Sequence, residues 1–145
     1  MSLRKIMCAL FAIAIFAPSA KSQGPAPRFR IRTITAGVTL KSLDDTTTII
    51  SAIEFLKLAK KKFTNAGYEV QTIRVATSNL YSYLHNISLN EAIPYLKAFD
   101  RIASSNGIAL FSIGQVLSPD QVDDSIGEWA DALFKSTKVI SFNLS

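Results

Sequence analysis

One arginine stands inside an otherwise apolar stretch of the chain. Arg74 lies in the segment Tyr68 to Thr77, which reads as a β-strand, and alternation puts it on one face with Thr72 and Ala76. A guanidinium in such a strand needs a carboxylate, a phosphate or a carbonyl as its partner. Two interpretations stay open: a clamp for an anionic substrate, or an ion pair inside the fold. The sequence does not identify the partner of Arg74, and the ion pair is then the simpler of the two interpretations.

Other polar residues follow the expected strands at their carboxyl ends. In parallel β/α folds, ligand sites collect at this edge of the sheet. The chain therefore offers a set of candidates for binding a small-molecule substrate: Thr39 and Lys41 after the first strand, Thr77, Ser78 and Asn79 after the second, and Ser112 and Gln115 after the third. No catalytic residue can be assigned among them.

The usual signatures of catalysis or metal binding are missing from the sequence. His85 is the only histidine, so a metal site of the usual kind is not expected. There is no Gly-rich phosphate loop, nucleophile elbow or paired-carboxylate spacing, and no cofactor is indicated. Tyrosines near the second strand could form an aromatic binding patch or pack against their own fold: Tyr81, Tyr83 and Tyr95.

The elements that position these residues alternate between strands and helices. Strands are predicted at 29–40, 68–77, 108–113 and 139–142. A helix capped by Asp44 or Asp45 runs to about Asn65, with an apolar stripe of Ile49, Ile50, Ile53, Leu56, Ala59 and Phe63. The capping box that begins at Ser88 starts a second helix, with a kink or a shifted start expected at Pro94. The segment from Ser118 to Gln121 starts a third.

The order βαβαβαβ predicts an α/β fold with a parallel sheet, as in a partial β/α barrel. Four strands are too few to close such a barrel, since about eight are needed. The last strand would then be left at an open edge, which could pair with a second copy of the chain. We therefore expect residues 29–145 to be the N-terminal part of a larger barrel domain.

The N-terminus has the layout of a secretory signal peptide. Arg4 and Lys5 precede an apolar run from Ile6 to Phe16, and small residues follow up to Ser22. The run is too short for a bilayer core, which takes about 20 apolar residues. We expect cleavage after Ser22, which leaves a short extended leader at 23–28 and no membrane segment. The protein would then be secreted.

Cleavage would change both the charge and the cysteine content. Basic residues would fall from 16 to 13 against 11 acidic ones, a net charge near +2, which does not suggest nucleic acid as a partner. The only cysteine, Cys8, would be lost with the signal peptide. Asn86-Ile87-Ser88 is an N-glycosylation sequon, and in a host that glycosylates exported proteins we expect Asn86 to be modified.

Two segments resemble a known family. Residues 32–40 (RTITAGVTL) and 67–77 (GYEVQTIRVAT), separated by one amphipathic helix, are similar to the N-terminal signatures of the domain-of-unknown-function 711 family. The resemblance implies a fold related to the β/α barrel of pyruvate formate-lyase-like proteins, of which this chain covers the N-terminal third. It implies no activity. Lyase chemistry is not carried over, because no glycyl-radical loop or catalytic cysteine is visible.

These observations leave three hypotheses on function. The first is a secreted, truncated form of an enzyme-like domain that acts on a small polar or anionic substrate, with Arg74 as its clamp. The second is a non-catalytic secreted interaction module that uses the open sheet edge. The third is a truncated product without independent function.

Overall fold

The computed structural model describes residues 29–116 and 126–144. Their elements follow one another in the predicted order, with one short helix added. They are β1 (Arg30–Val38), α2 (Thr46–Asn65), β2 (Glu69–Thr77), α3 (Tyr81–Leu84), α4 (Leu89–Ser105), β3 (Leu110–Gln115), α5 (Ile126–Ser136) and β4 (Ile140–Asn143). The predicted signal peptide, the leader at 23–28 and the helix start at 118–121 lie outside the described residues.

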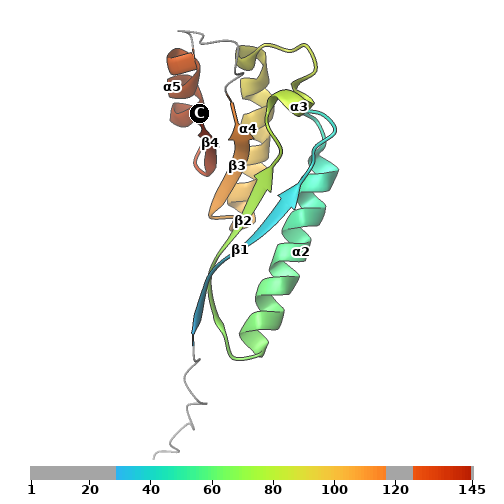
Figure 1. The fold of residues 1–145 in the computed structure, drawn as a ribbon, viewed down its shortest axis with the longest axis vertical. Coiled ribbons are helices and arrows are strands. Elements are labelled where there is room, and N and C mark those ends of the chain that lie inside the picture. Colours follow the sequence, from blue (N-terminus) through green and yellow to red (C-terminus); the bar gives the residue numbers. More distant parts are fainter. Residues whose placement is uncertain (1–28, 117–125, 145) are drawn as a thin grey trace, which may run out of the picture.

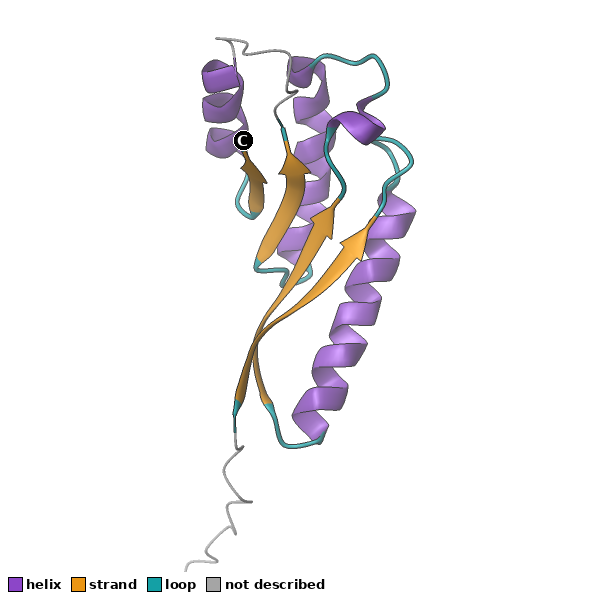
Figure 2. Cartoon of the chain, in the orientation of Figure 1, coloured by secondary structure: helices purple, strands orange, loops and turns teal. Residues whose placement is uncertain are grey.

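The four strands form one parallel sheet with the order β1-β2-β3-β4. Figures 1 and 2 show α4 behind the strands and α2 alongside β1 and β2. The predicted α/β fold with an alternating parallel sheet is confirmed, and the arrangement is that of a partial β/α barrel. Strands β1 and β2 continue well beyond the short strands β3 and β4 as a twisted two-stranded ribbon.

Side chains near the helix starts cap two of the helices. Asp45 caps α2 by accepting a hydrogen bond from the Thr48 amide at 3.2 Å. Ser88 and Glu91 form the predicted capping box at the start of α4. Helix α4 begins at Leu89 and continues through Pro94, so the alternative of a shifted start was wrong. The proline falls on an exposed side of the helix, where its ring meets solvent rather than the core.

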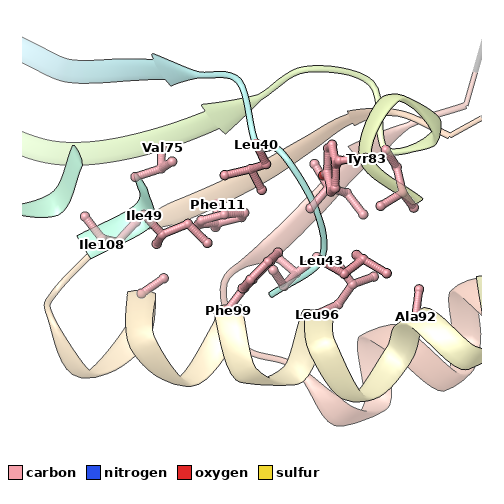
Figure 3. Packing of buried hydrophobic residues seen from close by; sticks show 14 of the residues in the cluster. Leu40, Leu43, Ile49, Val75, Tyr83, Ala92, Leu96, Phe99, Ile108 and Phe111 are labelled. Carbon is pink, nitrogen blue, oxygen red and sulfur yellow. The ribbon is translucent and has the colours of Figure 1, made fainter. Parts of the chain in front are cut away.

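The hydrophobic core lies between the sheet and the helices. Figure 3 shows Phe111 of the sheet directed toward Phe99 of α4, with Val75 and Leu96 in the same cluster. The rings of Phe99 and Phe111 are 5.8 Å apart, and all four side chains are buried. Burial of large aliphatic and aromatic side chains like these supplies about 1.5–3 kcal/mol each, which fixes the sheet against α4.

Two residues of the predicted stripe of α2 depart from the prediction. Ile50 and Phe63 were assigned to the buried stripe, yet they are 45% and 42% exposed, and Ala52 is buried instead. Phe63 belongs to the C-terminal end of the helix, which lies only beside the β1–β2 ribbon. Ile50 lies near the start of the helix, next to the buried Ile49, so its exposure comes from its place at the margin of the apolar face.

A buried carboxylate fixes the start of β4. Asp100 of α4 is 4% exposed, and its Oδ1 accepts hydrogen bonds from the backbone amides of Lys138 and Val139, both at 2.8 Å. The sequence analysis missed this residue, because Asp100 looks like an ordinary polar position of an amphipathic helix. Its partners lie almost forty residues further along the chain, so no local pattern marks them.

Candidate functional site

The face of the sheet opposite α2 and α4 carries small and polar side chains. Ile73 and Val75 belong to the core on the helix side, so Arg74 between them projects from the opposite face. In the register of the sheet, Arg74 lies between Thr35 of β1 and Leu110 of β3. The neighbouring row contains Gly37, Ala76, Ser112 and Ser141. Arg74 thus lies beside Leu110 in its own row, and the row next to it has small side chains only.

The Arg74 side chain lacks a partner for one of its buried atoms. Its Nε is buried and has no hydrogen-bond acceptor within the described residues. The ion pairs found in the same part of the chain are Arg30–Glu69 at 2.8 Å and Lys135–Asp131 at 2.7 Å, and neither involves Arg74. The structural ion pair considered from the sequence is therefore not supplied by residues 29–116 or 126–144.

The loop after β1 contains the candidates Thr39 and Lys41, both exposed. The Lys41 amide donates a hydrogen bond to the Asp45 carboxylate at 3.1 Å, and this bond lowers the pKa of Asp45. The Lys41 carbonyl lies 2.6 Å from Nε2 of His85. The contact with His85 ties the loop after β1 to the segment after β2, and Lys41 itself is exposed.

Thr77 has a structural partner. Its hydroxyl lies 2.9 Å from the hydroxyl of Tyr83 and also donates to the Ser78 carbonyl. Tyr83 is fully buried, and this burial raises the pKa of its phenol to about 12. Thr77 pairs in register with Val38, on the helix side of the sheet, so it does not share a face with Arg74.

Asn79 shapes the segment that follows β2. Its side-chain oxygen accepts a hydrogen bond from the Tyr81 amide at 3.0 Å, and its carbonyl accepts from Ser82. These bonds start the short helix α3, which was not among the elements predicted from the sequence. Asn79 is the sequence feature from which this turn could have been predicted, because asparagine side chains favour such turns. The Asn79 side chain is exposed at the carboxyl end of the sheet.

The structure therefore divides the predicted candidates into two groups. Arg74 and Ser112 lie on the open face of the sheet, in adjacent rows. Thr39, Lys41 and Asn79 lie at the carboxyl end, on segments that also carry Thr77. Strand geometry places Arg74 about 10 Å before the end of β2, since it precedes Thr77 by three residues at about 3.3 Å each.

Two hollows border the carboxyl half of the sheet. One, of about 180 Å³, lies between the loops after β1 and β2, with Asp44, His85 and Tyr95 in its lining. The other, of about 570 Å³, runs between the free edge of β1 and α2, and its lining includes Thr35, Thr47, Thr48 and Ser51 beside apolar residues such as Phe55. Neither hollow is lined by Arg74, which lies on the open sheet face instead.

Residues 26–142 match the model of a family described as "Uncharacterised ACR (DUF711)". The chain belongs to this family. The resemblance noted from residues 32–40 and 67–77 is thereby confirmed. A search of curated proteins found no match.

Membership of the DUF711 family leaves the chemistry to be argued from the residues. Within 29–116 and 126–144, no three histidine, cysteine or acidic side chains gather as metal ligands would. None of the helices in the same ranges is long and apolar enough to cross a bilayer. The strongest chemical feature of this DUF711 chain is accordingly the arginine on its open sheet face.

Proposed function

We propose that the open sheet face around Arg74 binds the anionic group of a small polar substrate, within a barrel-type domain of the DUF711 family. The observation that carries the proposal is the buried Nε of Arg74, which has no acceptor among the described residues. A buried polar group without a partner is costly, by about 1–3 kcal/mol, so it is normally satisfied by some acceptor.

The chemistry of the side chain indicates the kind of acceptor. A guanidinium presents Nε and a terminal nitrogen as a planar fork, which fits two oxygens of a carboxylate or a phosphate. The small side chains of Gly37, Ala76 and Ser112 in the next row leave space for such a group. The Ser112 hydroxyl could add a further hydrogen bond to it.

The position of Arg74 is compatible with a ligand that enters from the carboxyl end. Barrel-type β/α domains place their sites at this end, where the loops after the strands meet. In the proposed arrangement, Arg74 holds the anionic group, and Lys41 and Asn79 contact the outer part of the ligand. Thr39 and Thr77 lie close by, with Thr77 acting through Tyr83 as a support.

We also propose that the chain is secreted. The support is the sequence of residues 1–22, in which a basic start, a short apolar run and small residues follow one another as in a cleaved signal peptide. The proposed ligand site would then face an extracellular solution.

The experiment is isothermal titration calorimetry on the full chain, with inorganic phosphate and succinate as probes. Arg74→Ala should weaken binding by about 10- to 100-fold, because a hydrogen bond to a charged group contributes about 1.5–3 kcal/mol. Arg74→Lys should restore only part of the affinity, since the ammonium lacks the fork. The matched control is Arg101→Ala, which removes an exposed arginine of α4. Equal binding by wild type and Arg74→Ala would refute the proposal.

A second candidate function rests on the sheet edges. Among the described strands, β1 and β4 each pair with one neighbour only, so both present free backbone groups. An extended segment of a partner, or a second copy of the chain, could add to such an edge. This interaction module predicts a discrete dimer or complex in analytical ultracentrifugation. A well-folded monomer at all concentrations would exclude self-pairing.

A further inference from the structure

We infer that Asn86 carries an N-linked glycan, at the rim of the carboxyl end of the sheet. The inference rests on the proposed secretion of the chain, and it is independent of anion binding by Arg74. Asn86-Ile87-Ser88 meets the residue requirement for this modification. The conformation of these three residues in the folded chain shows which of their side chains has room for a glycan.

Asn86 projects from a tight turn between α3 and α4. Both His85 and Asn86 have a positive φ, of 46° and 60°, a conformation in which asparagine is enriched among residues other than glycine. Asn86 is exposed, and its side chain makes no hydrogen bond within residues 29–116 and 126–144. A bulky group on its amide nitrogen would therefore extend into solvent without displacing a neighbour.

The other two residues of the sequon are held by the fold. Ile87 is partly buried against the hydrophobic core. The Ser88 hydroxyl caps α4: it accepts from the Glu91 amide at 3.3 Å and donates to the Glu91 carboxylate at 2.7 Å. The turn thus directs Ile87 toward the core and ties the exposed Ser88 hydroxyl to Glu91, and it leaves the Asn86 side chain in solvent. A glycan at this position is compatible with the capped helix.

The transfer forms one bond and breaks one. The Asn86 amide nitrogen attacks the anomeric carbon of an oligosaccharide carried by a lipid diphosphate, the donor that a secretory compartment supplies. The bond from that carbon to the diphosphate oxygen breaks, and the lipid diphosphate leaves with the electron pair. The amide nitrogen gives up one proton to a base of the transferase. No oxidant or reductant takes part.

The chain contains a second sequon that serves as an internal comparison. Asn143 lies in β4, where its backbone pairs in register with Gln115, and its carbonyl accepts from the Val116 amide at 3.1 Å. Its backbone is thus part of the sheet ladder, whereas Asn86 lies in an exposed turn. We expect the glycan at Asn86 and none at Asn143.

The glycan would also lie close to the proposed ligand site. His85, next to the modified residue, contacts the Lys41 carbonyl in the loop after β1. A glycan on Asn86 would therefore stand beside two of the loops that follow the strands. Because glycans are bulky and solubilising, other proteins would not bind to the carboxyl end of the sheet near Asn86. Pairing of the β4 edge would remain unaffected.

The test is secretion of the full chain from a eukaryotic host, followed by treatment with peptide N-glycosidase. We expect a mobility shift on treatment, and mass spectrometry should find the asparagine at position 86 converted to aspartate. The shift should disappear in Asn86→Gln and Ser88→Ala. It should persist in Asn143→Gln and in Ser88→Thr, which keeps both the sequon and a capping hydroxyl. A chain that is secreted without a glycan would overturn the inference, and so would a shift that survives Asn86→Gln.

A second form of the protein separates this inference from the proposed secretion. Residues 1–22 are replaced by a proven signal peptide. If the natural chain stays inside the cell but the replaced form is glycosylated at Asn86, secretion is refuted and the glycan site stands. If the replaced form is exported without a glycan, the site itself is refuted.

Discussion

Gly114 of β3 packs directly on the peptide that follows Ser78. A Cβ built on Gly114 would lie 2.8 Å from the Ser78 carbonyl oxygen, closer than side chains tolerate. Gly114 also has a φ of +74°, which favours glycine. This contact holds the segment after β2 against the end of β3, at the edge where the candidate ligand residues meet.

Gly114→Ala should lower the free energy of unfolding by more than the cost of placing alanine at a positive φ. Gly107 has the same φ of +74° but no atom within 4 Å of a built Cβ, so Gly107→Ala is the matched control. The control should cost about 1–2 kcal/mol from the left-handed conformation. Gly114→Ala should cost more, because the Ser78 carbonyl must also move. Urea unfolding measures both. Equal losses would show that the contact with Ser78 is unimportant.

Asp100→Ala should lower the free energy of unfolding by about 2–4 kcal/mol. The substitution leaves the backbone amides of Lys138 and Val139, in a partly buried position, without their acceptor. Asp100→Asn should lose less, because it keeps one side-chain oxygen. Asp131→Ala, which breaks an exposed ion pair with Lys135, should change stability by less than about 1 kcal/mol. Hydrogen exchange would localise the damage, and protection of β4 that survives Asp100→Ala would contradict this role.

Tyr83 should make the stability sensitive to alkaline pH. Burial raises the pKa of its phenol to about 12, whereas the ordinary value of 10.0 applies in the unfolded chain. Between these values the folded state keeps a proton that the unfolded state loses, so stability falls as the pH rises. Tyr83→Phe should remove this part of the fall and cost about 1 kcal/mol at neutral pH, through the lost bond to Thr77. Identical alkaline profiles of the two proteins would argue against it.

The capping box should contribute to stability at acid pH. Hydrogen bonds from Ser88 lower the pKa of Glu91 below its ordinary value of 4.5. The unfolded state therefore binds more protons than the folded state in this range, and stability is lost as the pH falls through the folded pKa. Glu91→Gln should show a shallower acid dependence in urea unfolding. Glu54→Gln on α2 serves as the control. An equal change in the acid dependence of both variants would show that the capping box has no specific role.

The features that could be predicted are those whose determinants are close together in sequence. The order of strands and helices along the chain and the Asp45 and Ser88 caps each follow from a few adjacent residues, and the structure contains all of them. The family resemblance likewise rests on two continuous segments. These features could be predicted without knowing which elements contact one another in the folded chain.

The features that were missed depend on contacts between distant segments. The role of Asp100 requires the start of β4, and the exposure of Phe63 follows from how little of the sheet reaches the C-terminal end of α2. For the site, alternation along the strand separates Arg74 from Thr77, but the sequence could not show which of the two faces the helices cover. Only the packing of Ile73 and Val75 decides that.

The most direct test of the account observes the Arg74 Nε itself. The resonance of its Nε–H group can be assigned by NMR as the signal that Arg74→Lys removes, and then followed while phosphate is added to the full chain. The account predicts a saturable shift of this signal as an oxygen of the anion accepts the hydrogen bond. If the Arg74 signal stays unchanged at phosphate concentrations that shift exposed arginines such as Arg101, the open sheet face is not the anion site.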